Sequence, residues 1–160
     1  MTARRLALLA AFGSALLLGG AFVFQMLGYL PCKLCLWQRW PHAAAILAGL
    51  ASFVVPVAAA AVAGALAALT TAGIGLYHAG AEAGWWEGPQ SCTGAGAGLG
   101  GLSGGDLLST EAPVGIVRCD EVVWQLFGIS MAGWNAILSF GLALIWITAL
   151  RRAMAARDRG

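Results

Sequence analysis

Long stretches without charge dominate this chain. Residues 6–32, 40–81 and 122–150 contain no Lys, Arg, Asp or Glu. Each stretch exceeds the ~20 apolar residues with which a helix crosses the hydrocarbon of a bilayer. The middle stretch is long enough for two crossings, and Pro56 within it favours a tight turn between them.

The pattern predicts an all-α membrane protein, a four-transmembrane-helix bundle with two outward-facing loops that carry cysteines. The expected helices are residues 6–28, 39–56, 58–79 and 129–150, and the expected outer loops are residues 29–38 and 80–128. We expect residues 1–160 to form a single integral membrane domain. The composition agrees, because 60% hydrophobic and 10% charged residues are far from the mix of a soluble globular protein.

Basic residues gather at the two ends of the chain, whereas the long loop at 80–128 holds six acids and one base, Arg118. The terminal bases are Arg4, Arg5, Arg151, Arg152, Arg157 and Arg159. Short loops rich in Lys and Arg stay in the cytoplasm, so the sequence predicts cytoplasmic termini and cysteines on the outer side of a bacterial inner membrane. A cleaved signal peptide is an alternative for the N-terminus, but its apolar core normally spans ~7–15 residues. Here the apolar segment continues to Tyr29.

Four cysteines give the strongest chemical signal: Cys32 and Cys35 form a C-x-x-C pair, and Cys92 and Cys119 follow in the long loop. A C-x-x-C closes too short a loop to be a useful staple, but it tunes a thiol pKa and a redox potential. The sequence therefore favours thiol–disulfide exchange in an oxidising compartment. Two alternatives stay open, a four-cysteine zinc site and two passive disulfides that staple the outer loops.

Three polar side chains are expected near the C-x-x-C at the same membrane surface. Arg39 lies one helical turn past Cys35, and a guanidinium there could stabilise a thiolate or a carbonyl oxygen that gains negative charge. His78 and Glu82 lie one turn apart at the outer end of the third expected helix. Such a convergence suits a quinone, which is flat, lipid-soluble and accepts two electrons. Snorkelling of Arg39 to the headgroups and a simple interfacial His–Glu pair are the alternatives.

Aromatic and glycine-rich segments complete the outer side. Five tryptophans are expected near the outer surface, as an interfacial belt or as part of a site for a flat ring; they are Trp37, Trp40, Trp85, Trp86 and Trp124. Residues 96–101 match G-x-G-x-x-G, but they neither follow a strand nor open a helix, so a dinucleotide site is not expected. The glycines of residues 94–105 favour a flexible tether that lets Cys92 and Cys119 move relative to Cys32.

Three segments together resemble the disulfide bond formation protein B (DsbB) family, and the similarity covers nearly the whole chain. They are Pro31-Cys32-Lys33-Leu34-Cys35-Leu36-Trp37-Gln38-Arg39-Trp40, Gly75-Leu76-Tyr77-His78-Ala79-Gly80-Ala81-Glu82 and Cys119-Asp120-Glu121-Val122-Val123-Trp124-Gln125-Leu126-Phe127-Gly128. The resemblance implies a four-helix inner-membrane oxidoreductase. It would reoxidise a periplasmic thioredoxin-like dithiol oxidase (DsbA-like) and reduce ubiquinone or menaquinone, with no nucleic acid among its partners.

The resemblance also implies a role for each cysteine. Cys92 would form the mixed disulfide with the partner, Cys119 would attack Cys32, and Cys35 would remain as the thiolate beside the quinone and Arg39. His78 corresponds to a family histidine near the quinone. Glu82 stands where some members have glutamine, so a carboxylate could relay protons there instead of an amide hydrogen bond. The remaining alternative from another class is a structural or interaction membrane protein with two stapling disulfides and no turnover.

Overall fold

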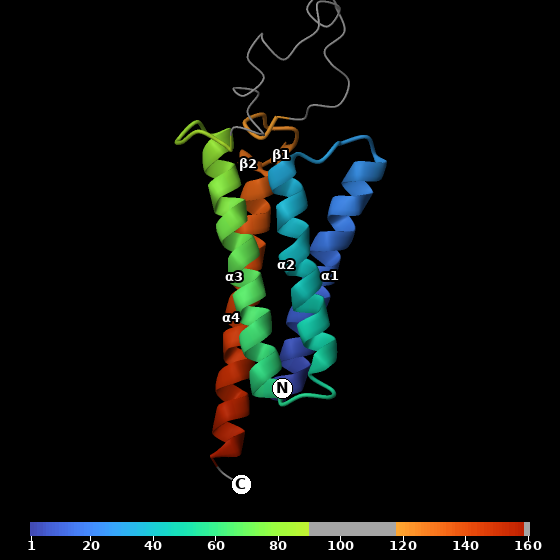
Figure 1. Ribbon diagram of the computed structural model, residues 1–160, viewed down its shortest axis with the longest axis vertical. Helices are drawn as coiled ribbons and strands as arrows, with labels where there is room; N and C mark the ends of the chain where they lie inside the picture. Colours follow the sequence, from blue (N-terminus) through green and yellow to red (C-terminus); the bar gives the residue numbers. More distant parts are fainter. Residues whose placement is uncertain (90–117, 159–160) are drawn as a thin grey trace, which may run out of the picture.

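The computed structural model describes residues 1–89 and 118–158. Its described part is an up-and-down bundle of four helices, with both termini at one end (Figure 1). The helices are α1 (Ala3–Met26), α2 (Lys33–Ala51), α3 (Val57–Glu82) and α4 (Met131–Arg157). The connections after α1 and α3 and the segment before α4 lie together at the opposite end, which we call the loop end.

The second helix begins and ends earlier than hydropathy suggests. Cys32 is its N-cap, and the Cys32 sulfur accepts a hydrogen bond from the backbone N–H of Cys35 at 3.3 Å. A capped helix can start inside a polar segment, so α2 starts at Lys33 where the sequence predicted 39. Pro56 stands at the N-cap of α3, after the connection that the sequence expected there.

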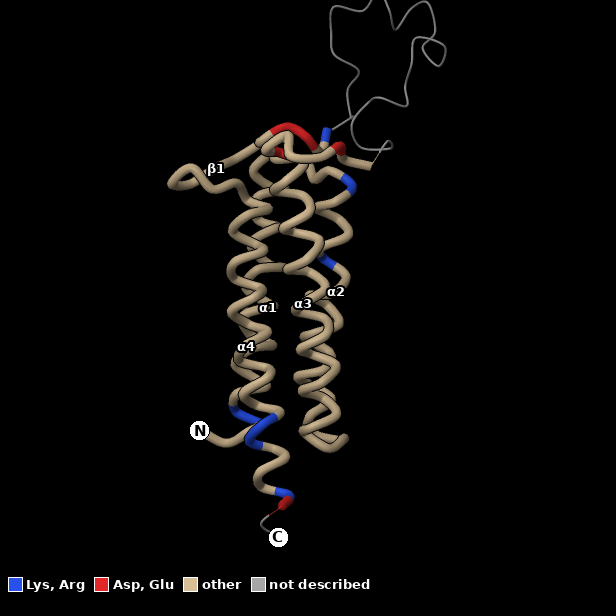
Figure 2. Tube along the Cα trace, turned by 90° about the vertical axis from the view of Figure 1, so that its left-hand side faces the viewer, with Lys and Arg blue, Asp and Glu red and all other residues tan. Residues whose placement is uncertain are grey.

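Three helices of the described part, α1, α3 and α4, are long and apolar enough to cross a membrane. The fourth, α2, has 19 residues and carries Lys33, Gln38, Arg39 and His42, which lower its hydropathy. The structure thus agrees with a helical membrane bundle, with three candidate spans and a fourth helix. Most bases lie at the end of the termini and most acids at the loop end, although Lys33, Arg39 and Arg118 lie toward the loop end and Asp158 lies near the C-terminus (Figure 2).

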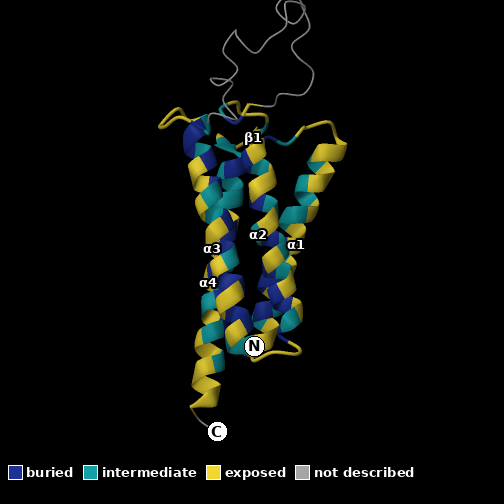
Figure 3. Ribbon diagram, viewed as in Figure 1, coloured by how far each residue is buried: buried dark blue, intermediate teal, exposed yellow. Residues whose placement is uncertain are grey.

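Small residues make up most of the buried interior of the bundle, whereas many large apolar residues are exposed. Figure 3 shows buried and exposed positions alternating along the helices. The buried cluster consists mostly of alanines from all four helices around Trp146, which is fully buried. Gly64 of α3 lies against the Trp146 ring so closely that a methyl group there would overlap it. Close helix contact through small residues with lipid-facing large ones is typical of membrane bundles.

A short hairpin precedes α4 and was not part of the all-α prediction. Strands β1 (Gln125–Leu126) and β2 (Ile129–Ser130) pair antiparallel. Phe127 and Gly128 form the turn with positive φ angles of 53° and 77°, as a two-residue hairpin with matching twist requires. The hairpin is anchored at both ends: the Met131 N–H donates to the carbonyl of Trp124, and the Trp134 indole donates to the carbonyl of Leu126. It therefore fixes Trp124 beside the loop end of the bundle.

Candidate functional site

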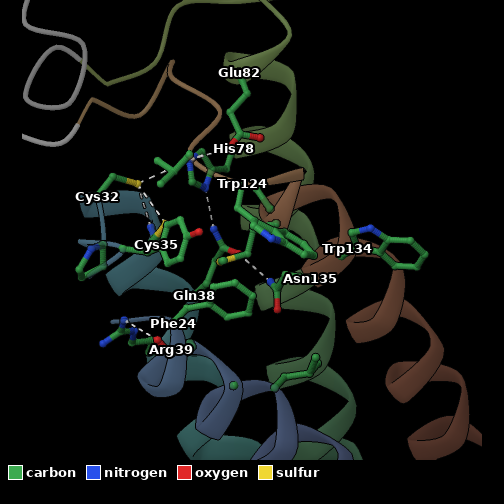
Figure 4. A pocket seen from close by; sticks show the side chains of 18 of the residues that line it. Phe24, Cys32, Cys35, Gln38, Arg39, His78, Glu82, Trp124, Trp134 and Asn135 are labelled. Carbon is green, nitrogen blue, oxygen red and sulfur yellow. Dashed lines mark hydrogen bonds and ion pairs between the residues drawn. The ribbon is translucent and has the colours of Figure 1, made fainter. Parts of the chain in front are cut away.

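A cavity of about 440 Å³ opens at the loop end, lined by residues of all four helices and of the segment that includes the hairpin. Most of its lining is apolar, and polar side chains lie among the apolar ones (Figure 4). The residues with polar or ionisable groups other than aromatic ones are Cys32, Cys35, Gln38, Arg39, His42, His78, Glu82, Arg118, Glu121 and Asn135. A largely apolar cavity with a few convergent polar groups is typical of a small-molecule site.

Cys32 and Cys35 lie together as thiols at the start of α2. Their sulfur atoms are 3.3 Å apart, and the Cys32 thiol donates to the Cys35 sulfur. This hydrogen bond, followed by burial, raises the pKa of Cys32 from 9.0 to about 12, while a hydrogen bond from His78 opposes the rise. Cys35, the other member of the pair, also lines the cavity.

Cys119 lies in the same buried cluster as the first cysteine of the C-x-x-C. It is fully buried and packs in one cluster with Cys32 and Leu34, with Cys35 at its edge. The neighbouring pair of Arg118 and Asp120 is joined by two hydrogen bonds of 3.0 and 2.7 Å, and the guanidinium lowers the pKa of Asp120. Cys92, the fourth predicted site cysteine, lies outside the described residues, as does the glycine-rich segment.

His78 and Glu82 reach the C-x-x-C from α3. The His78 Nε2 atom is 3.5 Å from the Cys32 sulfur and 3.7 Å from a Glu82 carboxylate oxygen. Both side chains are more than nine-tenths buried, and the second carboxylate oxygen of Glu82 has no partner within the described part. Of the residues that the sequence expected near the C-x-x-C, His78 therefore lies beside Cys32, and Glu82 lies beside His78.

Arg39 lines the cavity, but its described contacts are with α1. One guanidinium nitrogen donates to the Gln25 side chain at 2.8 Å and another to the Ala21 carbonyl at 3.5 Å. The guanidinium also lies over the Phe22 ring at 4.8 Å, and its buried Nε has no partner in the described part. Arg39 thus ties α1 to α2 and keeps one buried donor, and no described contact joins it to Cys35.

Aromatic side chains also line the cavity. Trp124 lies edge-on to Phe24, with ring centroids 5.2 Å apart, and both line the cavity with Trp134. Of the five tryptophans expected at the outer surface, Trp124 is the one in the lining, and Trp40 and Trp85 are more than two-thirds exposed. The interfacial belt stays a prediction.

The sequence analysis missed the polar side chains below the C-x-x-C. Gln38 hydrogen-bonds His78 at 3.0 Å and Asn135 at 2.7 Å, and Asn135 continues to His42 at 2.9 Å. The sequence did contain a signal for them. Polar residues within apolar helices cost free energy to bury in a membrane, so they usually face a polar partner or a cavity. Gln38 stands within the quoted C-x-x-C segment, and Asn135 is an isolated amide in the apolar stretch at 122–150.

Two sulfurs and one ring nitrogen also meet the spacing of a metal site. The Cys32, Cys35 and His78 ligand atoms all lie within 4.8 Å of one another. No fourth His, Cys, Asp or Glu joins this group among residues 1–89 and 118–158. Structural zinc sites take four protein ligands, and the described residues supply three ligands at this position.

The comparison with known proteins decides the family. Residues 3–149 match the family described as "Disulfide bond formation protein DsbB".

The chain belongs to the DsbB family.

A curated relative, "Disulfide bond formation protein B" of Verminephrobacter eiseniae (strain EF01-2), is 36% identical over 163 aligned residues, which cover 98% of this chain and 90% of the relative. No solved structure matches the chain. The resemblance noted in the sequence is therefore confirmed, and the DsbB family assignment with three candidate spans makes this a multi-pass membrane protein of disulfide bond formation.

Proposed function

We propose that the protein is a membrane protein-dithiol:quinone oxidoreductase. It reoxidises a periplasmic thioredoxin-like dithiol oxidase (DsbA-like) and passes the electrons to a quinone of the membrane, ubiquinone or menaquinone. In this proposal α2 is the fourth span, the protein resides in the bacterial inner membrane, and both termini are cytoplasmic. The loop end then faces the oxidising compartment, where disulfides persist.

One observation carries the proposal: buried Cys119 packs in one cluster with Cys32, and Cys32 and Cys35 both line the cavity. Thiol–disulfide exchange requires the attacking thiolate to approach one particular sulfur. Cys119 belongs to the long outer segment, and the contact brings it to the C-x-x-C of another segment. Packing of this kind supports transfer between the two cysteine pairs more than two independent staples.

The proposed exchange moves two electrons from the partner to the C-x-x-C through the outer cysteine pair. A thiolate of the partner attacks Cys92 of a Cys92–Cys119 disulfide, and Cys119 leaves as a thiolate. The partner's second thiolate then displaces Cys92, so that the partner is oxidised by two electrons. Cys119 attacks Cys32 of a Cys32–Cys35 disulfide, and Cys35 leaves as a thiolate. Cys92 finally displaces Cys32 from Cys119, which restores the outer disulfide and leaves Cys32 and Cys35 reduced by two electrons.

The cavity fits a quinone ring by size, shape and donor set. Its volume of about 440 Å³ lies in the range of small-molecule pockets, ~300–1,000 Å³. Phe24 and Trp124 offer ring faces and edges, and the buried Nε of Arg39 is a donor without a described partner. When bound, a quinone would accept two electrons and two protons. Within the protein, Arg39 would bind a carbonyl oxygen, and the apolar lining would exclude water.

The test is quinone consumption by the purified full-length protein. With a DsbA-like dithiol as donor, wild-type protein should bleach the absorbance of a ubiquinone or menaquinone analogue, whereas Cys35→Ser and Cys119→Ser should not. The matched control is the Cys119→Ser protein reduced directly with dithiothreitol. It should still consume quinone, because it retains the C-x-x-C and the cavity. Wild-type protein that consumes neither quinone would favour the alternative, a membrane protein stapled by two disulfides.

A further inference from the structure

A chain of hydrogen-bonded amides runs from His78 into the bundle between α2, α3 and α4. Gln38 of α2 contacts His78, and Asn135 of α4 contacts Gln38 (Figure 4). Gln38 and His78 are both buried. The proposed exchange gives none of these amides a task, and a buried polar chain with every member paired is a strong constraint on orientation.

Partner chemistry fixes the orientation of Gln38. A backbone carbonyl can only accept a hydrogen bond, so the Gln38 atom 3.2 Å from the Leu34 carbonyl is the amide nitrogen. The Gln38 oxygen then accepts from the Asn135 amide nitrogen at 2.7 Å. Reversing the Gln38 amide would set oxygen against oxygen at Leu34 and nitrogen against nitrogen at Asn135.

Asn135 is held in the matching orientation from α3 and α2. Its nitrogen donates to the Thr71 hydroxyl at 3.2 Å, and its oxygen accepts from His42 at 2.9 Å. Ser139 adds a longer hydrogen bond to the same oxygen at 3.4 Å. Both amides therefore have one satisfied orientation, supported from three helices.

This orientation decides which ring nitrogen of His78 carries a proton. The Gln38 nitrogen lies 3.0 Å from His78 Nδ1, and because it donates, Nδ1 must accept with its lone pair. The proton of the neutral ring is then on Nε2. That nitrogen lies 3.5 Å from the Cys32 sulfur and 3.7 Å from Glu82.

We propose that Gln38 and Asn135 are positioning residues that hold His78 in the Nε2–H tautomer, so that the ring donates toward the Cys32 sulfur. Cys32 carries negative charge whenever it leaves or attacks in a disulfide exchange, and a hydrogen bond to a charged sulfur stabilises it. The catalytic consequence rests on the exchange proposed above. The tautomer follows from the hydrogen bonds alone.

The same arrangement argues against a metal ion on Cys32, Cys35 and His78. A metal at Nε2 would require the ring proton on Nδ1, where metal-bound histidines normally donate to an oxygen. Here Nδ1 faces the Gln38 amide nitrogen, a second donor. A donor at this position stabilises a protonated Nε2 and opposes metal binding there.

Nitrogen-15 NMR of the full chain in detergent tests the tautomer, since protonated and unprotonated ring nitrogens differ clearly in chemical shift. The chain has two histidines, His42 and His78, and loss of signals in His78→Asn assigns them. Wild type should show His78 with the proton on Nε2. In Gln38→Leu the donor to Nδ1 is absent, and a mixture of both tautomers should appear. Ser139→Ala is the matched control, because it removes only the long bond on the far side of Asn135.

The rate of disulfide exchange should follow the tautomer. Exchange between the two cysteine pairs should slow in Gln38→Leu in proportion to the fraction of the Nδ1–H tautomer in the spectrum, about two-fold for an equal mixture, with Ser139→Ala at the wild-type rate. A wild-type His78 protonated on Nδ1, or a Gln38→Leu spectrum identical to wild type, would overturn the proposal. Since the spectrum needs no turnover, the tautomer is tested even if quinone reduction fails.

Discussion

Replacing Arg39 separates a role in quinone use from a role in joining helices. Arg39→Met keeps the length of the side chain and removes its charge and donors. One charge-assisted hydrogen bond contributes about 1.5–3 kcal/mol. If Arg39 gives such a bond to a quinone oxygen, kcat/KM for quinone should fall about 10- to 150-fold in Arg39→Met. Arg39→Lys should lose less, since lysine retains the charge without the planar fork.

The structure supplies the control for this experiment. Arg39 also donates to Gln25 at 2.8 Å, so Gln25→Leu removes the shortest of its contacts with α1 and retains the guanidinium that lines the cavity. We expect Gln25→Leu to change kcat/KM for quinone by less than Arg39→Met does. Steady-state quinone reduction at several quinone concentrations, expressed per folded molecule, gives the values. Equal losses in Gln25→Leu and Arg39→Met would refute the role in quinone binding and leave only the helix contact.

Three further predictions concern orientation, titration and packing. In a background without native cysteines, a membrane-impermeant thiol reagent should label Phe127→Cys at the exposed hairpin tip in intact spheroplasts, and Ala156→Cys only after lysis; the reverse would overturn the orientation. Because the pKa of Cys32 is raised to about 12, its buried thiol stabilises the reduced fold below pH 9 and loses that contribution as the pH rises toward 12. The Tm of reduced wild type should therefore drop over this range more than that of Cys32→Ser, and parallel curves would contradict the cause. Gly64→Ala, which overlaps Trp146, should destabilise the bundle by about 1–3 kcal/mol, whereas Gly19→Ala, with open space around it, should not; equal unfolding midpoints would contradict the packing.

Hydropathy predicts the helices well because lipid exposure is a property of each segment alone. The four expected helices appear in order, with the Pro56 turn between the second and third. Capping and turn chemistry are less visible in hydropathy. With Cys32 as its cap, α2 starts at Lys33, six residues before the predicted position, and the hairpin of residues 125–130 spans the predicted boundary between the loop and the last helix.

The site was predicted where residues are neighbours in sequence and missed where distant helices meet. Cys32 with Cys35, and His78 with Glu82, are one turn apart, and their spacing is visible in the chain. Gln38 and Asn135 are 97 residues apart, and they meet because α2 and α4 both pack against α3.

The contacts of Arg39 were also missed, because they too depend on how two helices pack. Its contact with Gln25 depends on how α1 packs against α2, which no local pattern encodes. Its role at the quinone stays a prediction, as do the roles of the four cysteines.

Disulfide mapping of the Cys35→Ser, Cys92→Ser double variant tests the central claim, transfer between the two cysteine pairs, most directly. The variant retains Cys32 and Cys119, which pack in one buried cluster. Under mild oxidation, peptide mapping by mass spectrometry without reductant should find nearly all of the protein with a Cys32–Cys119 disulfide, formed within single molecules. If both thiols stay reduced while the variant is folded, Cys119 does not reach Cys32, and the two pairs do not act in series.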